Sequence, residues 1–149
     1  MHKVNLSQVP VEEHPPSPSG RFRSFSQNIS IALGHIKDSD SKANSYPFDL
    51  EICQVPPGVS SSPYHAHSGQ SELYLILSGS GKFRSPIGLT ELTSGDAVYC
   101  GPGEPHQIIN DGEKDLVTFS PQANLQQQRG RHFDRRALEK NSRGSNHSC

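Results

Sequence analysis

Turn-forming residues divide the middle of the chain into short segments. The spacing of these turns constrains the fold more than any other feature. Residues 78–81 (Ser-Gly-Ser-Gly), 94–96 (Ser-Gly-Asp) and 110–112 (Asn-Asp-Gly) are suited to tight reversals, because Gly and Asn accept positive φ. Between such turns the apolar residues recur with a period of two, which is typical of half-buried strands. The pattern predicts an all-β protein built as a sandwich or barrel.

Composition supports this prediction. Apolar residues make up only 31% of the chain, and the 149 residues include 13 Gly and 12 Pro, which favours short strands over a helical bundle. Strands are expected at Ile29, Ile31 and Leu33, at Phe48, Leu50 and Ile52, around His65, and at residues 72–77, 81–84, 89–92, 97–100, 107–110 and 116–119. Residues 34–46 are polar and aperiodic, so an exposed loop is expected there.

The length of 149 residues fits one domain with one buried core. Residues 1–20 are rich in proline, which resists both helix and central strand, so an arm or edge extension is expected. The barrel is expected over residues 21–120. Residues 121–149 carry six basic and two acidic side chains and few apolar residues, so we expect a disordered basic tail.

Charge and cysteine usage exclude several classes of protein. A formal net charge of −1 gives no field that would recruit nucleic acid or a membrane surface, and the expected partner is a small molecule. The sequence shows no secretion signal and no apolar run long enough to span a membrane. Cys53, Cys100 and Cys149 are odd in number and widely spaced, which fits a reducing compartment and a cytoplasmic protein.

Three histidines and a glutamate have the spacing of metal ligands. On one strand, His65 and His67 would leave the same face with their Cα atoms roughly 6–7 Å apart. A turn at residues 68–71 would let Glu72 open the neighbouring strand and return its carboxylate to the site. His106 follows a rigid Gly-Pro turn and begins a strand, so it can supply a fourth ligand.

This donor set predicts one divalent transition metal. Imidazole nitrogen with a carboxylate and no thiolate suits Fe, Mn, Co, Ni, Cu or Zn. Four protein ligands on an ion that accepts six leave positions open, as at a catalytic site. The alternative is that these histidines only pack or face solvent, but burying them with a carboxylate and no cation would cost several kcal/mol.

The same residues carry a family resemblance. The two stretches concerned read Gly58-x6-His65-x-His67-x4-Glu72-x6-Gly79 and Gly95-x7-Gly103-x2-His106-x3-Asn110. They resemble the two conserved motifs of the cupins, and the likeness covers roughly residues 22–119. It implies a small, single-domain antiparallel jelly-roll β-barrel with His65, His67, Glu72 and His106 as metal ligands inside it. By the same resemblance, homodimers are common.

The chain departs from the family pattern in three places. Six rather than five residues separate Gly58 from His65, and Gly101 stands where the second motif usually has proline. Cupins usually continue with a further apolar strand, whereas residues 116–119 run directly into the polar tail. Two explanations are therefore open: an incompletely closed barrel, or a tail that derives from a truncated or altered reading frame.

Other side chains are candidates for contact with substrate. Tyr74 would face inward two residues after Glu72, where it could act on a substrate or a metal-bound water as the catalytic residue, or serve only as a core aromatic. Tyr64 and Gln70 could rim the entrance, and Arg84 could anchor a carboxylate or phosphate. Simple solvent exposure is the alternative for these three residues.

Two functions remain open from the sequence. The first is a metal-dependent enzyme of isomerase or oxygenase type acting on a small polar, sugar-like or carboxylate-bearing molecule. The second is a binding module that captures such a molecule without turning it over. The sequence identifies no second acid or base beside the ligand set.

Overall fold

The computed structural model describes residues 1–36 and 46–124. Most of the expected polar loop at residues 34–46 and nearly all of the expected tail lie outside the described residues. Within the described residues, no helix combines the length and apolar character that a membrane crossing requires.

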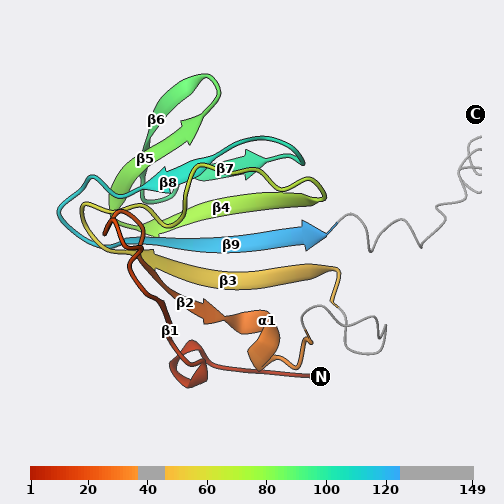
Figure 1. Ribbon diagram of the computed structural model, residues 1–149. Helices are drawn as coiled ribbons and strands as arrows, with labels where there is room; N and C mark the ends of the chain where they lie inside the picture. Colours follow the sequence, from red (N-terminus) through yellow and green to blue (C-terminus); the bar gives the residue numbers. More distant parts are fainter. Residues whose placement is uncertain (37–45, 125–149) are drawn as a thin grey trace, which may run out of the picture.

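Two antiparallel β-sheets form the body of the protein, as the sequence predicts (Figure 1). The strand order is β1-β2-β3-β9-β4-β7 in the larger sheet and β6-β5-β8 in the smaller. The strands are β1 (Glu12–His14), β2 (Ser24–Asn28), β3 (Phe48–Val55), β4 (Gln70–Ser78), β5 (Ser80–Ser85), β6 (Gly88–Thr93), β7 (Ala97–Cys100), β8 (Gln107–Ile109) and β9 (Leu116–Asn124). This arrangement is the predicted all-β jelly roll.

The apolar core lies between the two sheets. Its buried members come from both sheets and are Val55, Ile76, Phe83, Leu92, Cys100, Ile108 and Leu116. Gly79 makes the tight connection from β4 to β5 possible, because its φ is +83° and a Cβ there would collide with the Asp115 carbonyl. Polar side chains are buried as well, among them Glu72, His106 and Thr118.

The strand predicted at Ile29, Ile31 and Leu33 is wrong, because these residues form a helical turn, α1 (Ile29–Ala32). Asn28 caps the turn by accepting a hydrogen bond from the Ile31 N–H at 3.0 Å. Ile31 faces solvent with 47% of its surface exposed. Ile29 and Leu33 are four residues apart, so the same apolar spacing also suits one face of a helix.

The strand predicted around His65 is absent, and the segment instead makes one isolated antiparallel bridge with His106. The two residues exchange backbone hydrogen bonds of 3.1 Å and 2.8 Å. The strand that carries Glu72, β4, pairs with β9 and β7. The hairpin expected between the segment of His65 and the strand of Glu72 therefore does not form.

The strand expected at residues 116–119 runs further than the sequence predicts, and the degree of barrel closure stays a prediction. Strand β9 continues to Asn124 and lies between β3 and β4 in the larger sheet. It forms eight residue pairs with β3. The pairing between β9 and β4 is interrupted at Leu73 and Tyr74, which lie opposite Pro121 and Ser120. Proline has no N–H to donate to the neighbouring strand, so an interruption beside Pro121 is expected. The domain boundary at residue 120 stays a prediction.

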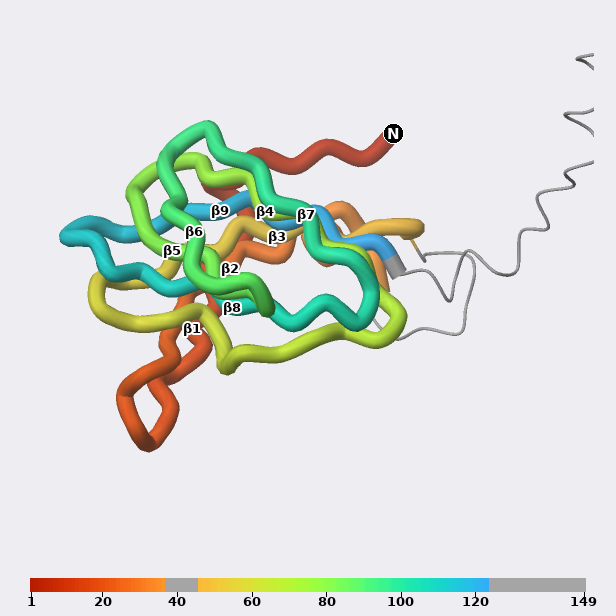
Figure 2. The backbone as a smooth tube through the Cα atoms, turned by 90° about the horizontal axis from the view of Figure 1, so that it is seen from above, coloured from red at the N-terminus to blue at the C-terminus, as the bar shows by residue number. Residues whose placement is uncertain are grey.

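The N-terminal segment forms the edge of the larger sheet. A single 3-10 turn, η1 (Leu6–Gln8), is followed by β1, which pairs with β2 through Glu12 and Ser26 and through His14 and Ser24. Figure 2 shows the loop between β1 and β2 projecting from one end of the body. The expected edge extension is thus a hairpin that contributes to the end of the cavity described below.

Candidate metal centre

The four predicted ligands converge. One ligand atom from each of His65, His67, Glu72 and His106 lies within 4.8 Å of the other three. Glu72 comes from β4 of the larger sheet, and His106 directly precedes β8 of the smaller sheet. The cluster therefore joins the two sheets and could hold one metal ion.

Backbone hydrogen bonds fix the two motifs against each other. Besides the bridge between His65 and His106, the Gly103 N–H donates to the His67 carbonyl at 2.8 Å. Gly103 adopts a φ of +78°, a backbone conformation that residues with a side chain rarely adopt. Three of the four ligands are thus held in place by main-chain contacts.

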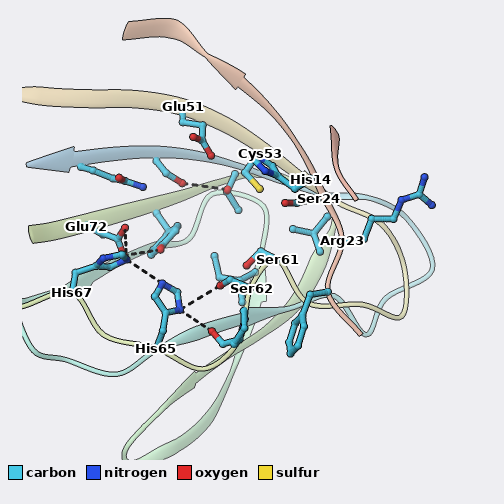
Figure 3. A pocket seen from close by; sticks show the side chains of 18 of the residues that line it. His14, Arg23, Ser24, Glu51, Cys53, Ser61, Ser62, His65, His67 and Glu72 are labelled. Atoms are coloured by element: carbon cyan, nitrogen blue, oxygen red, sulfur yellow. Dashed lines mark hydrogen bonds and ion pairs between the residues drawn. The ribbon is translucent and has the colours of Figure 1, made fainter. Parts of the chain in front are cut away.

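The imidazole rings present the nitrogen atoms that a metal would bind. Nδ1 of His65 lies 2.7 Å from the Pro63 carbonyl, and Nδ1 of His106 lies 2.9 Å from the Glu104 carbonyl. Each carbonyl accepts from Nδ1–H, so the Nε2 atoms are the ones left to bind a metal. Nε2 of His106 would do so after losing the proton that it donates to Glu72. The Nε2 atoms of His65 and His67 face each other at 3.0 Å (Figure 3). Lone pairs aimed at a common point fit a bound divalent cation.

Glu72 is the electrostatic centre of the cluster and is only 3% exposed. Its carboxylate lies 2.7 Å from Nε2 of His106 and 3.5 Å from Nε2 of His67. The Tyr74 hydroxyl donates to it at 2.9 Å. Burial works against the charge on Glu72, but hydrogen bonds from His106 and Tyr74 hold its pKa below the usual value.

Two neighbouring groups have raised pKa values. Burial also works against charge on His106, yet hydrogen bonds with Cys100, Glu72 and the Glu104 carbonyl raise its pKa to about 10. Burial and then the charge of Glu72 raise the pKa of Tyr74, so its hydroxyl stays protonated and acts as a donor. Without an ion, the cluster holds itself together as a hydrogen-bonded ion pair.

A cavity of about 490 Å³ opens beside the cluster (Figure 3). His65, His67, Glu72 and Tyr74 form part of its wall. Its other lining residues come from the N-terminal hairpin, β3, the segment before His65, β8 and β9, and they are His14, Pro15, Ser17, Phe22, Arg23, Ser24, Glu51, Cys53, Val55, Ser61, Ser62, Pro63, Ile108, Thr118, Ser120 and Gln122.

The structure places the three predicted substrate residues outside this lining. The Arg84 guanidinium lies over the Tyr64 ring at 4.5 Å, and both side chains are exposed. Gln70 is half-buried at the start of β4. Contact of these residues with a substrate stays a prediction.

Several cavity residues were not singled out from the sequence as parts of the site. His14 and Ser24 reach the cavity only because β1 pairs with β2. The inward positions of β9 hold Thr118, Ser120 and Gln122. Polar side chains that alternate along a strand in this way could have indicated a polar cavity wall. Cys53 also lines the cavity, but burial raises the pKa of its thiol to about 12, which makes it a poor nucleophile.

Comparison with known proteins identifies relatives by sequence. The family model described as the Cupin domain matches residues 51–120. An oxalate-binding protein from Thermotoga maritima is 40% identical over 86 residues, which are 58% of this chain and 69% of that protein. All four predicted metal ligands lie within residues 51–120.

Solved structures agree with the fold. A predicted oxalate decarboxylase from Thermotoga maritima is 25% identical with a TM-score of 0.65, and the match covers 83% of this chain and 99% of the other. A sugar phosphate isomerase from Silicibacter pomeroyi is 18% identical with a TM-score of 0.64, covering 82% of this chain and 75% of the other. Both motifs, the jelly roll and the sequence matches agree, and the chain belongs to the cupin family.

Proposed function

We propose that this cupin is a metal-dependent enzyme of isomerase or oxygenase type that acts on a small polar, oxygen-rich molecule. The observation that carries the proposal is the position of the cluster: His65, His67 and Glu72 form part of the wall of a cavity of about 490 Å³. A bound divalent ion would polarise a carbonyl or hydroxyl oxygen, or would bind dioxygen if it were iron. A structural ion would instead be enclosed by its ligands.

Tyr74 is the proposed catalytic residue of the chain itself. It lines the cavity and its hydroxyl donates to Glu72, so it can fix the carboxylate and still face a bound molecule. Its hydroxyl also lies 3.2 Å from Nε2 of His106. In this role Tyr74 orients the substrate by accepting a hydrogen bond from a substrate hydroxyl, because its one O–H is donated to Glu72. Its raised pKa keeps it from acting as a base.

Elemental analysis of untagged protein tests the proposal. We expect near-stoichiometric Fe, Mn, Co, Ni, Cu or Zn in the protein and loss of that metal in the His65→Ala/His106→Ala double variant. Iron would direct the activity assay to dioxygen consumption, and the other metals to isomerase panels of sugars and hydroxy acids. Turnover by the loaded protein should disappear in His67→Ala, and absence of metal after reconstitution would refute the proposal.

A second candidate function is a binding module without turnover. It is favoured by the relative from Thermotoga maritima, which is named an oxalate-binding protein and is 40% identical over 86 residues. Calorimetry with oxalate, followed by analysis of the recovered ligand, separates the two functions. Tight binding with oxalate recovered unchanged, and no turnover of any panel compound, would favour the binding module.

A homodimer remains part of the proposal, and the outer face of the larger sheet offers a surface for it. Leu73 and Leu77 on β4 point away from the cavity and are 39% and 43% exposed, and Tyr99 on β7 is 63% exposed. A twofold dimer would bury such a patch against its own copy. Analytical ultracentrifugation should show a dimer that Leu77→Lys dissociates, and a monomeric wild-type protein would overturn this part. The cytoplasmic location rests on the sequence alone.

A further inference from the structure

We infer that the inner face of β9 forms a second subsite, which binds the hydroxyl groups of an uncharged polyhydroxylated substrate such as a sugar or sugar alcohol. The subsite consists of Thr118, Ser120 and Gln122, with Ser24 of β2 nearby in the cavity wall. The inference rests on the proposed function, because the subsite shares its cavity with the candidate metal centre.

The polar character of this face is unexpected for a strand inside a sheet. Leu116 begins the inward row of β9 and belongs to the core, but the next inward positions are Thr118 and Ser120, which are 1% and 2% exposed. Gln122 continues the row and is half-buried. Strands in the middle of a sheet usually place apolar side chains toward the core, so this row is polar for a reason other than packing.

The row begins directly beside the metal cluster. Gln122 is the pairing partner of Glu72, and the same register places Ser120 opposite Tyr74. Paired residues on antiparallel strands have Cα atoms about 4.5–5.5 Å apart. A molecule held near Glu72 and Tyr74 would therefore extend onto Ser120 and Thr118.

The chemistry of the row suits hydroxyl groups. Each Ser or Thr hydroxyl both donates and accepts, as does the carboxamide of Gln122, and a sugar hydroxyl does the same. The Thr118 and Ser120 hydroxyls are 3.4 Å apart, a long contact that leaves room for shorter hydrogen bonds with a ligand. Ser61 and Ser62, which lie beside His65 in the cavity wall, add further hydroxyl groups (Figure 3).

The charges around the cavity disfavour a phosphorylated substrate. Arg23 is the one Lys or Arg among the described residues that line the cavity. Its guanidinium donates to Glu13 at 2.8 Å and 3.1 Å and lies 5.1 Å from the centre of the Phe25 ring. The side chain runs away from His65 and His67 (Figure 3). An anionic phosphate in the subsite would therefore meet hydroxyls and no available cation among these residues.

The size of the cavity disfavours oxalate as the whole ligand. At about 30 Å³ for each water molecule, a volume of about 490 Å³ corresponds to roughly sixteen waters. Oxalate has only six non-hydrogen atoms and would leave the β9 row uncovered. A six-carbon sugar or sugar alcohol has twice as many and would cover more of the β9 row.

Calorimetry on the metal-loaded full chain tests the inference. The probes are a panel of common six-carbon sugars and sugar alcohols, the same compounds carrying a phosphate, and oxalate. Thr118→Val removes the hydroxyl and keeps the shape, Ser120→Ala removes the second hydroxyl, and Thr90→Val makes the same change as Thr118→Val at an exposed position of β6. Metal content and melting temperature are measured for every variant.

We expect at least one uncharged compound to bind more tightly than its phosphate and than oxalate. Thr118→Val and Ser120→Ala should each weaken this binding about two- to tenfold, the effect of losing one hydrogen bond, and Thr90→Val should leave it unchanged. Binding of only phosphates or oxalate, or wild-type affinity in both cavity variants, overturns the inference. Absence of metal from the wild-type protein would instead refute the proposed function. The measurement of metal content therefore distinguishes failure of the inference from failure of the proposed function.

Discussion

Asn110 is fully buried and ties the end of β3 to the turn at residues 110–114, so its replacement should destabilise the protein strongly. Its Nδ2 donates to the carbonyls of Val55 and Lys114 at 2.7 Å and 2.8 Å, and its Oδ1 accepts from the Gly112 N–H at 2.9 Å. In Asn110→Ala all three backbone groups lose their partner. A buried group left in this state costs about 1–3 kcal/mol, and only the bond to Val55 is fully buried, so we expect a total loss of about 3–5 kcal/mol.

Thermal and urea unfolding followed by circular dichroism measure this loss. For a domain of this size, it corresponds to a fall in melting temperature of about 10–20 °C. Asn110→Asp keeps the shape and the acceptor for Gly112 but removes both donors, so it should be nearly as destabilising. Asn5→Ala is the matched control, because Asn5 caps η1 at an exposed position and its loss should cost about 1 kcal/mol or less. A loss below 1 kcal/mol in Asn110→Ala would refute the reasoning.

Three further predictions concern the cluster. The metal-free protein should be most stable near pH 5–6.5 in urea titrations. Because the pKa of Glu72 is lowered from 4.5 in the folded protein, the stability that its carboxylate contributes is lost as the pH falls below that value. The pKa of His106 is raised from 6.5 to about 10, so its contribution disappears between those values as the pH rises, and a flat profile would contradict both. Tyr74→Phe should weaken metal binding about ten- to a hundredfold in chelator competition, and unchanged affinity would exclude a role in holding Glu72. Gly103→Ala should cost about 1–2 kcal/mol of stability in thermal melts because of its positive φ, whereas equal melting temperatures would show that the turn can relax.

The cluster of three histidines and a glutamate could be predicted from the sequence, because turn-forming residues lie next to each of its two motifs. His65 and His67 were expected on a regular strand, and the structure brings their nitrogen atoms together from an irregular segment instead. The ligand set was predictable although its local geometry was not, because ligand identity depends on residue chemistry and spacing. The partner of each segment depends on backbone pairing across the fold, which local patterns do not specify.

The rest of the cavity could not be predicted for the same reason. His14 and Ser24 are ten residues apart and meet through the register of the N-terminal hairpin, which no turn signature near them specified. The run of Ile29, Ile31 and Leu33 fits both a strand and a helical turn, and the capping side chain of Asn28 favours the helix. Strand β9 was expected to end at residue 119 because a polar tail follows directly, but pairing with β3 and β4 extends the strand to Asn124.

The N-terminal hairpin contributes His14, Arg23 and Ser24 to the cavity wall, yet it lies outside residues 51–120, the region that the Cupin domain model matches. The four candidate metal ligands lie entirely inside that region. The part of the sequence that carries the candidate metal ligands and the part that shapes one end of the cavity can therefore change independently. Relatives that keep every ligand can differ in what they admit, and exchanging residues 12–26 between them is a route to new selectivity that leaves the metal cluster intact.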